Sequence, residues 1–182
     1  MALPRFPTVR DLYDAFPTAA DDVGIPASDE GCMAFLRSLT TNAAWNSAIS
    51  LCAYILPRRQ AVWWGSQSLR SVRRQFSQAE AATLDAAEDW VREPDETHRR
   101  AALELGSRAD AGLPATWMAL AAGWSGGSVV PPEYGYVRPP PEQTARAVRA
   151  GLFIAIAGIP QDEVPDVIKP CIEYGATLAN QG

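Results

Sequence analysis

The stretch that decides the fold is residues 56–70, which read LPRRQAVWWGSQSLR. Pro57 predicts a break from the preceding segment, because proline lacks an N–H donor and its ring clashes with the turn before it. At about 100° per residue, the apolar residues that follow fall on one side of a helix: Ala61, Val62, Gly65, Leu69, Val72 and Phe76. We therefore predict an amphipathic helix that continues to about residue 76 and packs on that side.

The opposite side of this helix is basic. Residues 56–75 contain five arginines and no carboxylate, and Trp63 falls among the arginines, away from the apolar side. Trp63 can stack on guanidinium groups, pack against a further helix, or contact a binding partner. Arginine and tryptophan are both enriched in binding hot spots. The residues that we single out as a candidate partner-binding face are Arg59, Trp63, Arg70 and Arg74.

The next segment carries the opposite charge. Residues 78–97 hold seven acidic residues and one basic residue, Arg92. A short connection at Ser77 predicts that a helix over residues 78–92 lies antiparallel to the basic helix. We expect the arginines to face these acids. This gives a second interpretation of the basic face, in which the acidic helix covers it.

Hydrophobic periodicity predicts helices in most of the remaining chain. Pro17, Gly24 and Pro26 indicate a loop, and Ser28 followed by two acids predicts a helix start. The further predicted helices span 8–16, 28–39, 42–56, 96–111, 114–124, 142–157 and 162–179. The second half of helix 142–157 is apolar on all sides, so we expect it at the centre of the core.

These patterns predict an all-α fold. We expect a single-domain helical bundle of seven or eight helices with one Pro-rich surface loop. Residues 1–7 contain two prolines and are expected to form an extended tail, so that residues 8–182 make up the helical domain.

The irregular part of the chain is residues 125–141, which we call the Pro-rich segment. Five prolines fall within residues 131–141, which predicts an extended backbone laid over the surface. Tyr134, Tyr136 and Arg138 offer contact groups, and we add them to the candidate partner-binding residues. The glycine pair at 126–127 could bind phosphate, but it lacks the lysine of a phosphate loop and follows no strand. We favour a glycine turn that ends the preceding helix.

Composition narrows the function classes. The chain of 182 residues has a net charge of -5, which argues against a nucleic-acid partner, because such proteins need basic groups for phosphate contacts. The longest apolar run, residues 151–158, is far shorter than the roughly 20 residues that cross a bilayer, so we expect no membrane insertion. Without a signal-peptide pattern, we expect a cytoplasmic protein.

No residue pattern predicts catalysis, a cofactor or a metal site. His98 is the only histidine, and no nucleophile is placed by sequence to pair with it. Cys32, Cys52 and Cys171 are far apart and form no CxxC motif, so we expect three buried free thiols. We therefore predict a protein that is not an enzyme.

The order of several motifs resembles an uncharacterised family of bacterial helical proteins. These motifs are LPRRQAVWW at 56–64, AEDWVREP at 87–94 with RRAA at 99–102, WSGGS at 124–128 and PPP at 139–141. We associate that family with type VI secretion gene clusters. The resemblance supplies no catalytic residue, and it implies an accessory cytoplasmic role as an adaptor, an effector chaperone or an immunity-like partner.

Three functional hypotheses follow. The first is a non-enzymatic protein-interaction module, accessory to a bacterial type VI secretion system. The second is a small-molecule-binding or enzymatic helical domain, with a Trp-lined pocket that includes the turn at residues 126–127. The third is self-association into a homo-oligomer through an exposed helix face.

Overall fold

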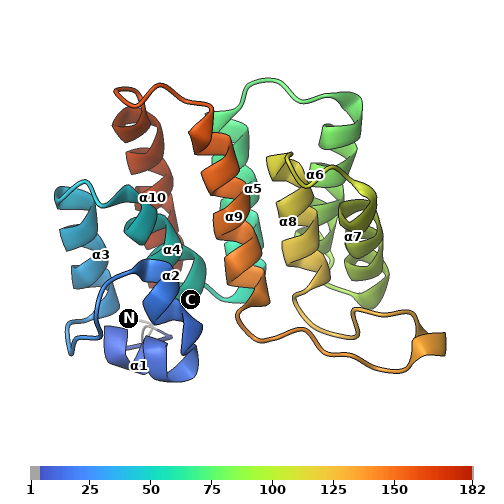
Figure 1. The fold of residues 1–182 in the computed structure, drawn as a ribbon, viewed down its shortest axis with the longest axis horizontal. Coiled ribbons are helices and arrows are strands. Elements are labelled where there is room, and N and C mark those ends of the chain that lie inside the picture. The colour runs from blue at the N-terminus through green and yellow to red at the C-terminus, as the bar shows by residue number, and fades with distance from the viewer. Residues whose placement is uncertain (1–4, 182) are drawn as a thin grey trace.

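The computed structural model describes residues 5–181 and confirms the all-α prediction (Figure 1). Ten α-helices and one 3-10 turn are found in this range, which holds no β-strand; the predicted number was seven or eight. Residues 1–4 of the predicted tail lie outside the described residues. The elements are α1 (Val9–Ala15), α2 (Thr18–Val23), α3 (Cys32–Thr41), α4 (Trp45–Ile55), α5 (Arg58–Val72), α6 (Gln78–Arg92), α7 (Glu96–Arg108), α8 (Pro114–Gly123), η1 (Pro132–Tyr134), α9 (Gln143–Ala157) and α10 (Val164–Gln181).

Helix α5 lies at the centre of the bundle. It packs against α4, α6, α8, α9 and α10, with the N-terminal helices and α10 to one side and α6–α8 to the other (Figure 1). Trp64 is fully buried, and its indole N–H donates to the carbonyl of Cys171 in α10 at 2.8 Å. Gly65 lets α8 and α9 approach closely, because a Cβ at this position would lie 2.8 Å from Met118 Sδ and Val148 Cγ1. The stretch at residues 56–70 thus joins both sides of the fold.

Opposite charges join α5 to α6, as predicted. Arg70 donates from Nε to Glu88 at 2.6 Å and from a terminal nitrogen to Asp85 at 2.7 Å. Arg73 reaches Glu80 at 2.7 Å near the turn between the helices. Glu80 also accepts from the backbone N–H of Ser77, the N-cap residue of α6. The acidic helix therefore neutralises Arg70 and Arg73, two of the five arginines in residues 56–75.

Helix α2 corrects the predicted loop at residues 17–26. Pro17 stands at its N-cap, where a missing N–H costs nothing, and Gly24 follows its last residue with a left-handed φ of 73°. Ala19 and Val23 are buried against the core. The residues that indicated a loop instead mark the two ends of a six-residue helix.

Helix α3 begins at Cys32, four residues later than the predicted start at Ser28. The carbonyls of Glu30 and Ser28 each accept, at 3.0 Å, from the backbone N–H groups of Val9 and Arg10 at the start of α1. These N–H groups have no partner within their own helix. The backbone of residues 28–30 therefore accepts hydrogen bonds from the start of α1 and is not the first turn of α3.

The second half of α9 is less central than predicted. Phe153 and Ile156 are only partly buried, and they line an open cleft instead of the innermost core. Within residues 5–181, no helix combines the length and the apolar character needed to cross a membrane.

Candidate functional site

The Pro-rich segment forms the longest irregular excursion in Figure 1, leaving α8 and returning to α9. Arg58, at the start of α5, ties its two ends together. One terminal nitrogen of Arg58 donates to the carbonyl of Ser125 at 2.9 Å, and the other donates to the carbonyl of Pro141 at 3.2 Å. The segment is thus a closed surface loop with fixed ends.

Two arginines of α7 hold the first half of the segment. Arg99 is buried and donates to the carbonyl of Ser128 at 2.9 Å, while Arg100 donates to the carbonyl of Val130 at 3.0 Å. Glu96 accepts from both guanidinium groups, at 2.6 to 2.8 Å. These hydrogen bonds, led by that from Arg99, lower the pKa of Glu96 to about 2. Charge buried at the start of α7 therefore fixes the backbone of the segment.

The turn at Gly126–Gly127 fits closely over Arg99. Helix α8 ends earlier, with Trp124 as its C-cap residue, so the glycine pair is not the helix cap that we predicted. Gly127 has a left-handed φ of +62°, and a Cβ there would lie 2.8 Å from a terminal nitrogen of Arg99. A Cβ on Gly126 would meet no atom within 4 Å. Gly127 is therefore the position at which glycine is required.

The two limbs of the segment also bond to each other. The N–H of Val129 donates to the carbonyl of Val137 at 2.8 Å, and the N–H of Val137 donates to Ser128 Oγ at 3.2 Å. Ser128 is buried, although it belongs to a surface loop. The base of the segment is thus a small hydrogen-bonded structure of its own.

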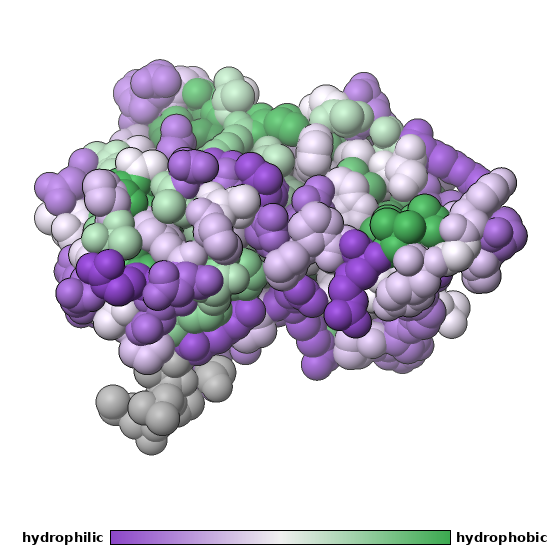
Figure 2. Space-filling view, turned by 60° about the horizontal axis from the view of Figure 1, so that its bottom comes forward, coloured by the Kyte–Doolittle hydropathy of each residue, from purple (hydrophilic) through white to green (hydrophobic). Residues whose placement is uncertain are grey.

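The tip of the segment exposes apolar and aromatic side chains. Tyr134 is 74% exposed and Tyr136 is 65% exposed, and the side chain of Val137, whose backbone belongs to the base, is 49% exposed. Arg138 is exposed as well. Figure 2 shows a compact hydrophobic patch on the right, in the region of the Pro-rich segment, with strongly hydrophilic residues on one side and weakly hydrophilic residues around most of the rest. Three of the predicted partner-binding residues, Tyr134, Tyr136 and Arg138, therefore lie together on an anchored loop.

Three of the other four predicted binding residues, Arg59, Trp63 and Arg70, are used within the bundle. Arg59 donates from Nε to the carbonyl of Val91 at 2.6 Å, at the C-terminal end of α6. The Trp63 indole is partly buried and donates to Tyr174 Oη in α10 at 2.8 Å, which is the helix-packing alternative for this residue. Arg70 is paired with acids of α6. Arg74 is exposed beyond the end of α5.

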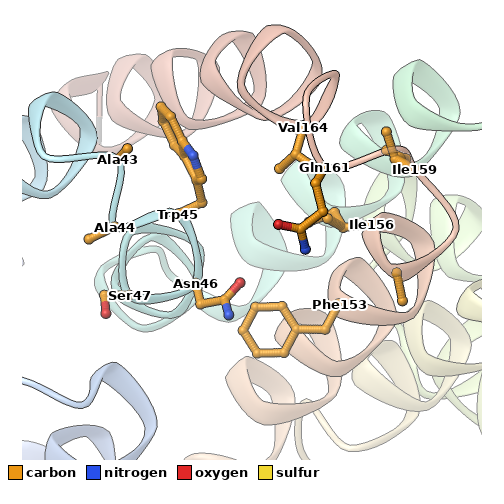
Figure 3. A pocket seen from close by; sticks show the side chains of 11 residues that line it. Ala43, Ala44, Trp45, Asn46, Ser47, Phe153, Ile156, Ile159, Gln161 and Val164 are labelled. Atoms are coloured by element: carbon orange, nitrogen blue, oxygen red, sulfur yellow. The ribbon is translucent and has the colours of Figure 1, made fainter.

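A separate cleft of about 650 Å³ opens between α4, α9 and the start of α10. Figure 3 shows the Trp45 and Phe153 rings on its walls and the side-chain amides of Asn46 and Gln161 directed toward the space between them. The turn at residues 126–127 does not line this cleft. This cleft therefore lacks the glycine turn that the predicted Trp-lined pocket was expected to include.

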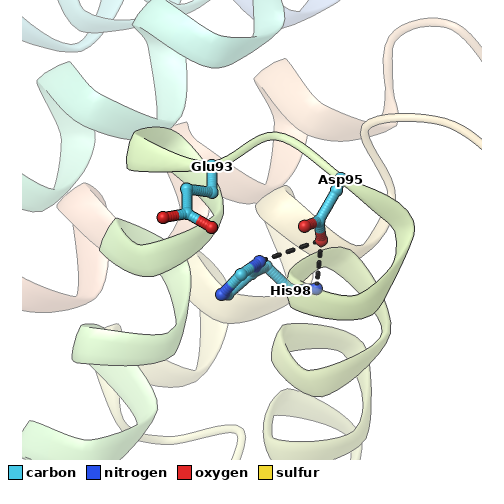
Figure 4. Close-up of side chains that lie close together, drawn as sticks. All are labelled: Glu93, Asp95 and His98. Atoms are coloured by element: carbon cyan, nitrogen blue, oxygen red, sulfur yellow. Dashed lines mark hydrogen bonds and ion pairs between the residues drawn. The ribbon is translucent and has the colours of Figure 1, made fainter.

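His98 lies in a cluster with Glu93 and Asp95, whose ligand atoms are all within 4.8 Å of one another (Figure 4). Asp95 is the N-cap of α7 and accepts from the backbone N–H of His98 at 2.8 Å. That bond comes first among those that lower the pKa of Asp95. His98 Nδ1 also lies 2.9 Å from Asp95 Oδ1. Helix capping accounts for this arrangement.

The cysteines lie in the core, as predicted. All three are buried and free. Burial raises the pKa of Cys32 to about 11 and also raises that of Cys52, so both thiols stay protonated near neutral pH.

Comparison with known proteins places the chain in a family. Residues 35–179 match the family described as "Family of unknown function (DUF6931)", which is well over half of the chain. The chain belongs to this family. No curated protein and no solved structure gives a significant match. The resemblance to an uncharacterised family is thereby confirmed. The DUF6931 match runs from α3 into α10 and includes the whole Pro-rich segment.

Sequence reasoning missed the residues that hold the site of this DUF6931 protein. Arg58 and Arg99 come from two helices, and their bonds to the segment span 29 to 83 residues of sequence, while Glu96 holds Arg99 in turn. One signal was present in the sequence: Arg58, Arg99 and Arg100 belong to motifs that carry the family resemblance, and the motifs at the two ends of the Pro-rich segment carry it as well.

Proposed function

We propose that this DUF6931 protein is a non-enzymatic protein-interaction module that binds its partner through the tip of the Pro-rich segment. The observation that carries the proposal is the exposure of Tyr134, Tyr136 and Val137 on a backbone whose base is hydrogen-bonded to α5 and α7. A loop held in place before binding loses less conformational entropy on association. Tyrosine is enriched at interfaces and in hot spots, because it combines apolar area with one polar group.

The arginines that bond to the backbone of the segment also support an interaction role. Arg58, Arg99 and Arg100 are directed at main-chain carbonyls, which fixes the shape of a loop. The resemblance noted from the sequence motivates a narrower form of the proposal, in which the partner is a component or effector of a type VI secretion system. In that form the protein acts in the cytoplasm as an adaptor, a chaperone or an immunity-like partner.

Affinity capture from a lysate of the source organism, followed by mass spectrometry, tests the proposal. Wild-type protein is compared with a Tyr134→Ala/Tyr136→Ala double variant and with Leu105→Ala, which removes an exposed apolar side chain from α7. We expect the double variant to lose a partner that wild type and Leu105→Ala both retain. Equal capture by all three proteins would refute the proposal.

A second candidate function is small-molecule binding in the cleft beside α4. Its volume of about 650 Å³ falls in the usual range for ligand pockets, roughly 300–1,000 Å³. Aromatic walls with a few amide groups are typical of such sites. A ligand-observed NMR screen of a fragment library tests this function, with Gln161→Ala as the variant that removes one amide from the cleft. Fragments that bind both proteins equally, or no binding fragments, would count against it.

A further inference from the structure

A second cleft, of about 350 Å³, lies at the base of the Pro-rich segment. We call it the arginine cleft. Its lining residues are Arg58, Gly126, Gly127, Arg138, Pro139 and Pro141. It therefore combines two guanidinium groups with a stretch of backbone that carries no side chains. The exposed tyrosines belong to the same segment.

The two arginines of this cleft lack a carboxylate partner. Among residues 5–181, neither Arg58 nor Arg138 forms an ion pair, whereas Arg70, Arg99 and Arg149 each pair with an acid. Each terminal nitrogen of Arg58 donates one hydrogen bond to a main-chain carbonyl. A guanidinium has five N–H donors, so three remain on Arg58. Within residues 5–181, the side chain of Arg138 donates no hydrogen bond.

A third cation adds to the positive charge. Arg5 donates to the carbonyl of Leu56 at 2.8 Å, so a main-chain oxygen holds its side chain. Arg5 and Arg58 both line a neighbouring hollow that shares Arg58 and Pro141 with the arginine cleft. The carboxylates nearest in sequence to Arg138 and Pro141 are Glu133 and Glu142, and neither pairs with these arginines within the part of the chain that the structure describes.

We infer that the arginine cleft binds a carboxylate of an acidic peptide segment in the protein partner. This inference rests on the proposed function and names the chemistry of the partner. The planar guanidinium fork matches a carboxylate in two parallel hydrogen bonds, and the absence of a side chain at Gly126, where a Cβ would meet no atom within 4 Å, leaves room for the approaching group. A peptide lying across the segment can contact Tyr136 and place one acidic side chain in the cleft. A nucleic acid binds through many phosphate contacts, which a few arginines on a chain of net charge -5 do not supply, whereas one carboxylate needs only one guanidinium fork.

NMR titration of the ¹⁵N-labelled full-length protein tests the inference. The probes are a (Gly-Glu)4 peptide, a (Gly-Gln)4 peptide of equal length, inorganic phosphate and a 12-nucleotide single-stranded DNA. We expect (Gly-Glu)4 to shift the amide signals of Gly126 and Gly127 and to bind about tenfold or more weakly to Arg138→Gln. Arg108→Gln removes the same charge from an exposed position on α7, and it should bind like wild type.

Several results would overturn the inference. These are equal shifts with (Gly-Gln)4, binding of phosphate or DNA that equals or exceeds that of (Gly-Glu)4, an equal loss in Arg138→Gln and Arg108→Gln, or no shift at the two glycines. Failure here is distinguishable from failure of the proposed function. If partner capture depends on Tyr134 and Tyr136 but not on Arg138, the proposed function is supported and the carboxylate site is refuted. If the Tyr134→Ala/Tyr136→Ala variant captures the same partners as wild type, the proposed function is refuted, whatever the result of the peptide titration.

Discussion

At the scale of single residues, Gly127 and Arg99 show how the base of the Pro-rich segment is built. The guanidinium of Arg99 occupies the space into which any side chain at position 127 would project. Gly127 also has a φ of +62°, a conformation that costs roughly 1–2 kcal/mol for other residues. The close contact and the backbone conformation act at the same position, so one substitution tests both.

Gly127→Ala should lower the free energy of unfolding by about 2 kcal/mol, because it adds backbone strain and displaces Arg99. Gly126→Ala is the matched control, since its Cβ meets no atom within 4 Å and its φ is not left-handed, and it should change stability by less than about 0.5 kcal/mol. Urea denaturation measures both variants. Equal effects at the two positions would contradict the fit over Arg99.

Ala43 is the one non-glycine residue with a positive φ in the described range, at 55°. It follows α3 and its C-cap residue Asn42, where glycine is usual. Ala43→Gly should raise the free energy of unfolding by about 0.5 kcal/mol, because relief of the left-handed strain exceeds the added entropy of the unfolded chain. Thermal denaturation should show a slightly higher Tm. A lower Tm would indicate that the Ala43 methyl group contributes more through packing.

Trp63 shows what a helical residue pattern can predict and what it cannot. Periodicity correctly placed it away from the apolar side of α5, but it left three interpretations open. The hydrogen bond from Trp63 to Tyr174 spans 111 residues of sequence. A helical pattern tells which side of a helix a residue occupies, and it does not tell which distant element covers that side.

At the scale of elements, the start of α7 controls the Pro-rich segment. Glu96 orients Arg99 and Arg100, and both arginines hold carbonyls of the segment. The pKa of Glu96 is about 2 in the folded protein, below its ordinary value of 4.5. A lowered folded-state pKa stabilises the protein above pH 4.5, and this contribution is lost as the pH falls from 4.5 to about 2.

Glu96→Gln should therefore make the free energy of unfolding fall less steeply between pH 4.5 and about 2, because position 96 no longer titrates. At pH 7 the variant should also be less stable than wild type, since two arginines lose an anionic acceptor. Glu104→Gln, which removes an exposed partner of Arg108 on the same helix, serves as the control. Denaturant titrations across this pH range compare the three proteins. Parallel pH profiles for Glu96→Gln and wild type would contradict the assignment.

Elements formed by neighbours in sequence were predicted best. The bounds of α6 matched the prediction, and the pairing of α5 arginines with α6 acids followed from charges within about 40 residues of chain. The late start of α3 depends on the backbone bonds that Ser28 and Glu30 make to α1, and α2 lies between residues that also indicate loops. These outcomes depend on tertiary contacts, which local patterns do not contain.

At the scale of the whole molecule, the Pro-rich segment was predicted as an exposed loop, but its anchoring was not. The arginine cleft brings together α5, the glycine turn and the prolines before α9, which are separated by up to 83 residues. The cleft beside α4 combines three elements in the same way. Both clefts form only when these distant parts of the chain pack together in the folded bundle. The central claim concerns only the first: the tip of the segment is the surface that meets a protein partner.

Site-specific photo-crosslinking in living cells tests this claim most directly. The photoreactive residue p-benzoylphenylalanine replaces Tyr136 in one protein and Leu105 in another, since both positions are exposed. The claim predicts a covalent adduct with a different protein, formed on irradiation at position 136 and not at position 105. The same adduct at both positions, an adduct only at position 105, an adduct with a second copy of this chain, or no adduct at position 136 would contradict it.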